Sequence, residues 1–370
     1  MTDQSPVPSV DGVLSAADVA ATARSIAAMQ EPSGAIPWTP GEKTDVWNHV
    51  EGAMALLVGG EVAAAERAYD WCARTQRADG SWAMETVVGE VRDASGETNM
   101  SAYLAVGVWH HWLLRRDRAF VDRMWPVVRR GLDFVVGMQL SFGGIAWSQE
   151  WAATPGGALR PAKVNEEALL AGSSSIYQSL RAGVALADLV DDPQPEWELA
   201  GGRLGHALRH HRDLFLDKSE FSMDWYYPVL GGAVRGAAAV DLLESGWETF
   251  VVPGLGIKCV SDNTWVTGAE TCELAMSLDA VGDHARALEQ FAAMQHLRTD
   301  DGRYWTGWVY PENVHWPHEH TTYTAAAVVL AADELSRTTR ASGIMRGDTL
   351  APHFDEMALE CGCTSRRVPA

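Results

Sequence analysis

The sequence predicts an all-α protein, an (α/α)6 barrel of six inner and six outer helices, and three observations lead to this prediction. A loose Gln–Gly–Trp pattern recurs along the chain. Helix-period segments with a half-exposed face alternate with segments that are apolar nearly all round. No alternation of polar and apolar residues is long enough to indicate a sheet. We expect a single domain over residues 1–340, followed by a flexible C-terminal tail over 341–370.

The repeat consists of a glutamine at the end of a helical segment, a glycine in the following loop and then an aromatic residue. A degenerate copy ends at Trp225. The clear copies are AAMQEPSGAIPW (27–38), ARTQRADGSW (73–82), VGMQLSFGGIAW (136–147) and AAMQHLRTDDGRYW (292–305).

The expected helices follow from this alternation. Amphipathic segments, which carry charges such as Glu66 and Arg123 between apolar positions, are predicted to form the outer layer. They lie at about 15–30, 61–76, 118–138, 195–212, 245–252 and 284–296. The segments richer in alanine, glycine and other small residues are predicted to be buried inside. They lie at about 44–58, 97–115, 172–190, 228–243, 267–281 and 320–336.

This order places a candidate site at one end of the barrel. Every Gly–Trp loop leads from an outer helix to the start of an inner helix, so all these loops meet at the same end. The chain has sixteen tryptophans, and nine of them fall in or beside these loops: Trp38, Trp47, Trp82, Trp147, Trp225, Trp265, Trp305, Trp308 and Trp316. Packing between loops could explain any one of them. Together they favour a cleft lined with aromatic rings, and the long loops at 82–96 and 148–171 are typical of functional segments.

Composition excludes several classes of partner. The net charge is -20 and no basic stripe occurs, which argues against nucleic acid and anionic membranes. No apolar run is long enough to span a membrane, and the start, MTDQSPVPSVDG, does not resemble a signal peptide. The five cysteines are few, odd in number and without zinc-finger spacing. We therefore expect a cytoplasmic protein with no metal and no cofactor; the sequence leaves its oligomeric state open.

Acidic residues occur at the predicted starts of the inner helices. Asp45 precedes the first inner helix and is either its N-cap or a carboxylate at the floor of the cleft. Glu51 lies two turns further on, in a helix predicted to be buried, and needs a partner such as His49 or an arginine.

A second group of acids surrounds the fifth inner helix. Glu270 follows Thr267 by three residues, which fits a capping box, yet Glu273 lies on the same flank and Asp262 and Trp265 stand just before. Two further acids have aromatic neighbours and could equally be ordinary surface charges: Glu319 among three histidines, and Asp224 beside Trp225.

Glycoside hydrolysis is the reaction that uses two carboxylates on opposite sides of a substrate held by aromatic rings. One carboxylic acid protonates the leaving oxygen, and the other activates water or attacks the sugar. We predict that Asp45 and Glu270 are the catalytic pair, with Glu319 as the reserve, and that a wide separation gives inversion. Which of the two is the acid stays open. The predicted substrate-binding residues are Trp38, Trp47, Asn48, Glu51, Trp82, Asp224, Trp225, Asp262, Trp265, Trp305, Trp308 and Glu319.

The repeat resembles the QW motifs of squalene and terpene cyclases and the helical ring of protein prenyltransferase β subunits. The chemistry of these families does not carry over. The DxDD proton donor of the cyclases is absent, and the DLVDD run at 188–192 has the wrong spacing. His320-Thr321-Thr322-Tyr323 resembles the zinc-ligand motif of prenyltransferases, but no Asp-x-Cys precedes it at the right place. An enzyme acting on an isoprenoid diphosphate is therefore the alternative hypothesis for the function. A non-catalytic glycan- or lipid-binding protein is a third hypothesis.

A second resemblance is to (α/α)6 glycoside hydrolases, whose last inner helix is similar to EHTTYTAAAVVL (319–330). More specifically, four segments resemble actinobacterial proteins often labelled prenyltransferase-like, among them the mycobacterial methylmannose polysaccharide hydrolases, which are intracellular endo-α-mannosidases. The segments are IPW (36–38), DVWNHVEGAMAL (45–56), ETCELAMSLDAVGD (270–283) and DGRYWTGWVYPE (301–312). The resemblance implies an α-1,4-linked, partly methylated mannan as substrate, whose methyl groups suit a tryptophan-lined cleft.

Overall fold

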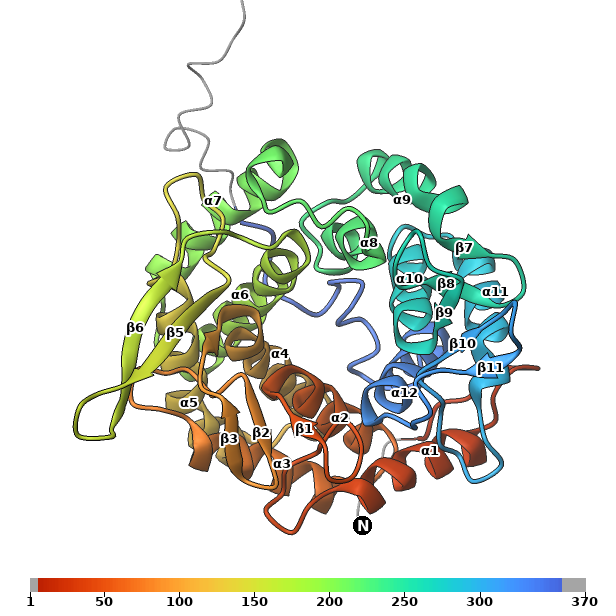
Figure 1. Cartoon of the computed structure of the whole chain (residues 1–370), viewed down its shortest axis with the longest axis horizontal. Coiled ribbons are helices and arrows are strands. Elements are labelled where there is room, and N and C mark those ends of the chain that lie inside the picture. The colour runs from red at the N-terminus through yellow and green to blue at the C-terminus, as the bar shows by residue number, and fades with distance from the viewer. Residues whose placement is uncertain (1–5, 355–370) are drawn as a thin grey trace, which may run out of the picture.

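The computed structural model describes residues 6–354, and twelve α-helices alternate between two layers of a ring in this part of the chain (Figure 1). The inner helices are α2 (Val46–Val58), α4 (Thr98–Arg115), α6 (Leu170–Val190), α8 (Ser222–Leu230), α10 (Gly268–Ala280) and α12 (Thr322–Ser336). Each contacts the next, and α12 contacts α2, so the inner ring is closed. The outer helices are α1 (Ala16–Met29), α3 (Val62–Thr75), α5 (Arg118–Val136), α7 (Pro195–His210), α9 (Ala237–Phe250) and α11 (His284–Ala293).

The boundary between α8 and α9 differs from the sequence prediction. The apolar run at 228–243 was expected as one inner helix, but the chain leaves α8 after Leu230 and begins the outer helix at Ala237. Gly231 lies so close to α6 that a Cβ there would meet the Ser174 carbonyl oxygen at 2.2 Å, and Gly232 has a φ of +87°. Such positions accept only glycine readily. Apolar composition alone could not reveal this break, because both helices are rich in apolar residues.

The glutamine of the first three clear copies ties its loop to the next outer helix, whereas Gln295 of the last copy bonds within its own segment, to Phe291 and Tyr304. Gln30 Nε2 donates to the carbonyl of Gly34, four residues on, and to the carbonyl of Ala64 in α3, both at 2.9 Å. Gln76 makes the same pair of bonds to Gly80 and to α5, and Gln139 to Gly143 and to α7. The repeat is thus a device for joining adjacent outer helices.

The glycine of the repeat provides close contact at the same junction. Gly80 has a φ of +95°, and a Cβ there would stand 2.0 Å from the Arg130 carbonyl oxygen of α5. At Gly302, the last copy, a Cβ would meet Ala21 of α1 at 2.9 Å. This copy therefore brings the end of the chain against its beginning and closes the outer layer.

Short antiparallel strands, which the sequence analysis did not predict, form at the loops. β1 (Lys43–Thr44) pairs with β2 (Glu85–Val87), and β2 pairs with β3 (Glu90–Asp93). β4 (Gly96–Glu97), β5 (Ser148–Ala153) and β6 (Leu159–Asn165) form a second sheet. The third comprises β7 (Val251–Val252), β8 (Gly256–Lys258), β9 (Trp265–Thr267), β10 (Gly307–Val309) and β11 (Val314–His315). Because β1, β4 and β9 run directly into α2, α4 and α10, the sheets form a rim around the starts of the inner helices.

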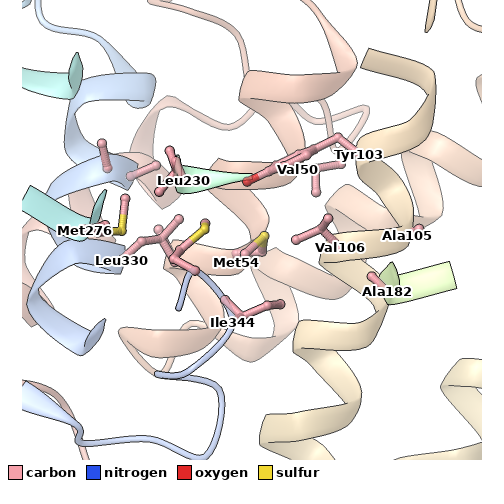
Figure 2. Packing of buried hydrophobic residues seen from close by; sticks show 14 of the residues in the cluster. Val50, Met54, Tyr103, Ala105, Val106, Ala182, Leu230, Met276, Leu330 and Ile344 are labelled. Atoms are coloured by element: carbon pink, nitrogen blue, oxygen red, sulfur yellow. The ribbon is translucent and has the colours of Figure 1, made fainter. Parts of the chain in front are cut away.

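The opposite end of the ring is closed by residues 337–354. Gln178 and Arg181 of α6 donate to carbonyl oxygens of Ile344 and Ala351. Ile344 is buried and belongs to the same apolar cluster as Met54 and Leu330 (Figure 2). The tail expected from residue 341 is therefore folded up to residue 354, because its apolar side chains fill the base of the ring. The rest of the expected tail, 355–370, lies outside the described residues.

An arginine fixes this closing segment electrostatically. Arg346 Nη1 lies 3.0 Å from Glu334 Oε1 of α12 and 3.2 Å from Asp279 Oδ2 of α10. Both carboxylates are almost fully buried. At Asp279, burial is outweighed by hydrogen bonds from Arg337 and His284, which lower its pKa, whereas at Glu334 burial outweighs the charge of Arg346 and raises the pKa to about 8. Because residues 337–354 close one end of the inner ring, the accessible end is the one where the inner helices begin.

No helix within residues 6–354 is long and apolar enough to cross a membrane.

Candidate active site

The starts of the inner helices lie side by side and carry most of the candidate side chains. Asp224, in the first turn of α8, accepts a hydrogen bond of 3.2 Å from the backbone N–H of Ala171, in the first turn of α6. The Thr322 hydroxyl at the start of α12 donates to the Pro37 carbonyl, in the loop that leads from α1 to β1 and α2. Exposed backbone N–H groups make this end of each helix favourable for carboxylates.

A buried glutamate surrounded by three tyrosines lies at the centre of this end. Glu273 Oε1 accepts hydrogen bonds from Tyr227 (2.7 Å) and Tyr323 (2.9 Å), and Oε2 accepts one from Tyr226. The tyrosines come from α8 and α12, the two helices that flank α10. Burial raises the pKa of Glu273 to about 8, and the charges of Glu51 and Glu270 add to this effect. The carboxyl group therefore holds a proton readily near neutral pH.

A second buried glutamate faces it from α2. Glu51 Oε1 accepts from the Trp47 indole N–H and the Tyr103 hydroxyl, both at 3.1 Å. Burial raises the pKa of Glu51 to about 7. The prediction that His49 or an arginine partners Glu51 was wrong. His49 bonds instead to the backbone of Ile36 and Ala68, which holds the helix against its outer neighbours.

Aromatic rings connect the two glutamates. The Trp47 ring lies 5.7 Å from that of Tyr103 and 5.6 Å, edge on, from that of Tyr227. The floor of the site thus consists of half-buried or buried rings whose polar edges point at carboxylates. Sugars bind to such surfaces through the same two features, since their C–H faces pack on rings and their hydroxyls bond to carboxylates.

Asp45, the first predicted catalytic residue, is buried and fulfils the capping role that the sequence left open. Its Oδ1 accepts from the Asn48 backbone N–H at 2.9 Å, and its Oδ2 from the Asn48 side-chain amide at 2.6 Å. Burial raises the pKa of Asp45, and the hydrogen bonds from Asn48 oppose this shift. Asn48, predicted to bind substrate, is thus placed to orient the Asp45 carboxyl group.

Glu270, the second predicted catalytic residue, is half-buried in the first turn of α10. The capping box is not formed, because the Thr267 side chain makes no cap bond. Burial raises the pKa of the Cys259 thiol, and the neighbouring, hydrogen-bonded Glu270 carboxylate raises it further. Glu270 is therefore not part of a capping box. It lies one helical turn before Glu273 in α10.

Glu319, the reserve carboxylate, is connected to the same floor. Its Oε1 accepts from the Trp38 indole N–H at 2.9 Å and from the Thr306 hydroxyl at 3.3 Å. The Trp38 ring packs against Tyr323 at 5.5 Å, so Glu319, Trp38 and the tyrosines of Glu273 form one continuous wall. Two tryptophans of the same rim, Trp305 and Trp308, lie further out against histidine rings.

Other predicted substrate residues lie away from this floor. Trp82 and Trp225 are buried, with indole N–H groups that donate to the carbonyls of Cys72 and Leu242, and both pack between helices. Asp262 is exposed in the turn between β8 and β9, and Trp265 donates to the Trp316 carbonyl at the rim. Within residues 6–354, no group of three or more histidine, cysteine or acidic side chains is placed to hold a metal ion.

Comparison with known proteins identifies the family. No family model matches the chain. The chain is 54% identical to the MMP endo-(1,4)-3-O-methyl-α-D-mannosidase of Mycolicibacterium hassiacum over 366 residues, which is 99% of each protein. The chain belongs to this endo-mannosidase family.

Several solved structures share the fold of this family member at low identity. A wild-type glycosidase has a TM-score of 0.62 and 14% identity, and the match covers 89% of this chain and 98% of that one. The GH63 mannosylglycerate hydrolase of Thermus thermophilus has a TM-score of 0.62 and 13% identity, with 84% and 99% covered.

Part of the candidate site does not follow from the sequence prediction. The prediction gives Glu273 only as a neighbour of Glu270, and it does not include Tyr103. Glu97 also escaped notice, although it is buried at the start of α4 and its pKa is raised to about 8 by burial and by the charge of Asp45. A signal was present for all three, because each lies in or just before a segment predicted to form an inner helix. The tyrosine partners of Glu273 come from other helices, however, so the sequence around Glu273 does not reveal them.

Proposed function

We propose that this protein is an (α/α)6-barrel glycoside hydrolase that cleaves internal α-1,4 linkages of a partly methylated mannan, methylmannose polysaccharide. The observation that carries the proposal is the 54% identity to the Mycolicibacterium hassiacum enzyme over 99% of both chains. The closed contacts among the six inner helices support the barrel, and the carboxylates and aromatic rings at its open end support the chemistry.

Asp45 and Glu270 are the proposed catalytic pair. Asp45 is assigned as the general acid, since burial raises its pKa and so favours the protonated form that donates to the leaving oxygen. Glu270 is assigned as the base, because its half-exposed side chain leaves room for the water that it activates. An attack by water on the face opposite the acid gives inversion of the anomeric carbon.

The deeper carboxyl groups have a supporting role in this proposal. Glu51 and Glu273 are already bonded to tryptophan and tyrosine donors, which fixes their orientation beneath the sugar. The rings of Trp38, Trp47 and Tyr227 offer apolar surface for the C–H faces and O-methyl groups of the substrate. We also propose that the protein works in the reducing cytoplasm, where its free thiols at Cys72 and Cys259 remain reduced.

The test is hydrolysis of a substrate panel by the purified protein without added metal. The panel contains methylmannose polysaccharide, unmethylated α-1,4-mannooligosaccharides and α-glucans, with products measured by mass spectrometry and their anomeric configuration by proton NMR. We expect shorter methylated oligosaccharides with inverted configuration. An intact panel, with the protein folded, would refute the function and direct the next assay to prenyl diphosphates.

Two substitutions test the catalytic assignment. Asp45→Asn and Glu270→Gln should each reduce kcat by about 10²–10⁴-fold, the usual contribution of general acid–base catalysis. Both changes are nearly isosteric, so we expect each variant to fold. The unfolding midpoint checks this expectation. Glu90→Gln, an exposed carboxylate in β3, serves as the control and should keep full activity. Full turnover in either of the first two variants would remove that residue from the pair.

A further inference from the structure

Buried polar atoms without a protein partner occur at the starts of the inner helices. Glu97 is 6% exposed and Asn99 is 4% exposed, yet Glu97 Oε2 and Asn99 Oδ1 accept no hydrogen bond from the described residues. The Ser222 and Thr267 hydroxyls, at the starts of α8 and α10, share this property. Native proteins satisfy nearly all buried polar groups, so unpartnered polar atoms at the open end of a ring indicate a ligand that supplies their hydrogen-bond partners.

Glu97 and Asn99 lie at the junction of three inner helices. Glu97 is the last residue of β4 and directly precedes α4, and Asn99 is in the first turn of that helix. The Asn99 side chain lies against the start of α6, since a Cβ on Gly172 would be 3.5 Å from Asn99 Cγ. On the other side, the charge of Asp45, the N-cap of α2, acts on Glu97. Glu97 therefore lies close enough to interact with the proposed general acid, and Asn99, two residues further on, lies toward α6.

We propose that Glu97 and Asn99 form a hydroxyl-binding subsite beside Asp45, which holds a sugar unit of the polysaccharide next to the bond that is cleaved. This inference rests on the proposed function and adds residues that bind substrate to the same site. Asn99 Oδ1 is an acceptor to which a sugar hydroxyl can donate. The Glu97 carboxyl, whose pKa of about 8 favours the protonated form near neutral pH, can both donate to and accept from a sugar hydroxyl.

The subsite has a consequence for methylation. A free hydroxyl donates to Asn99 Oδ1, whereas a methyl ether has no proton to donate. A methyl group at that position would also leave the buried Asn99 oxygen unpaired, which costs more than the loss of a solvent-exposed bond. The subsite therefore selects a position of the sugar ring that is not methylated.

The experiment measures binding separately from turnover. In the Glu270→Gln background, unmethylated α-1,4-mannotetraose is titrated calorimetrically into the parent and into the added substitutions Glu97→Gln and Asn99→Ala. We expect each added substitution to weaken Kd at least ten-fold and to raise KM in the otherwise native enzyme. The control is Glu85→Gln, a carboxylate that also acts on Asp45 but is partly exposed and paired with Lys43 at 3.3 Å; it should change Kd less than two-fold.

A permethylated tetraose completes the design as a double-mutant cycle. If Asn99 accepts from a sugar hydroxyl, Asn99→Ala should not weaken binding of the permethylated ligand any further. The unfolding midpoint should stay unchanged, because these oxygens make no hydrogen bonds to the described residues that could be lost. A lowered midpoint, or a Kd within two-fold of the parent, would overturn the subsite and leave the hydrolase proposal standing. Absence of cleavage and of binding by the native protein would instead overturn both.

Discussion

Replacing Gly80 by alanine tests whether the repeat holds the outer helices together, and Gly60 provides a matched control. Both glycines have left-handed φ angles, +95° at Gly80 and +87° at Gly60. Alanine at either position costs about 1–2 kcal/mol for that conformation. At Gly60, no atom lies within 4 Å of the new Cβ, so no further cost arises. At Gly80, the Cβ would stand 2.0 Å from the carbonyl oxygen of Arg130.

The loop at Gly80 must then move away from α5 by more than about 1 Å, since ordinary contacts of this kind exceed about 3.4 Å. This movement breaks the bonds of Gln76 to the Gly80 carbonyl (3.0 Å) and the Val127 carbonyl (2.8 Å). Each neutral hydrogen bond contributes about 1 kcal/mol. We therefore expect Gly80→Ala to lower the free energy of unfolding by about 2 kcal/mol more than Gly60→Ala does.

Urea unfolding followed by circular dichroism measures the difference. Both variants should keep the native slope of free energy against urea, so that the midpoints report stability directly. Equal midpoints for the two variants would refute the reasoning, because they would mean that the contact between loop and outer helix adds nothing beyond the backbone conformation.

Two further predictions concern buried charges. Arg346→Met should lower the free energy of unfolding by about 1–3 kcal/mol, because Glu334 and Asp279 lose Arg346 while Asp279 keeps its ion pair with Arg337. Arg340→Met, an exposed site in the same segment, should change the free energy of unfolding by less than about 0.5 kcal/mol. Similar losses in both variants would show that the ion pairs are not what fixes the segment. Glu51 has a pKa raised from 4.5 to about 7, so the folded state binds more protons than the unfolded state and stability falls as the pH rises from 4.5 through 7. Glu51→Gln should make this decline shallower in unfolding experiments at several pH values, and an unchanged slope would exclude Glu51 as its source.

The local signals in the sequence were sufficient for the alternation of helices. Charges such as Glu66 mark the outer helices, and the runs of small apolar residues mark the inner ones. The aromatic and acidic residues at the inner-helix starts were recognised for the same reason, since Trp47, Asn48 and Glu51 share one helix with its N-cap, Asp45. Where the pattern itself was ambiguous, the prediction failed: Gly231 and Gly232 end α8 inside an apolar run, because contact with α6 demands glycine there.

The division between sequence and tertiary structure is clearest at α10. Helical spacing is a local property of the chain, so the sequence places Glu270 and Glu273 one turn apart on a helix that is predicted to begin at the open end of the ring. The burial of Glu273 beneath three tyrosines, with Glu270 left half-exposed, follows from the packing of distant helices. Those tyrosines belong to α8 and α12, far from Glu273 along the chain in either direction, and desolvation by distant parts of the chain sets the pKa of a carboxyl group.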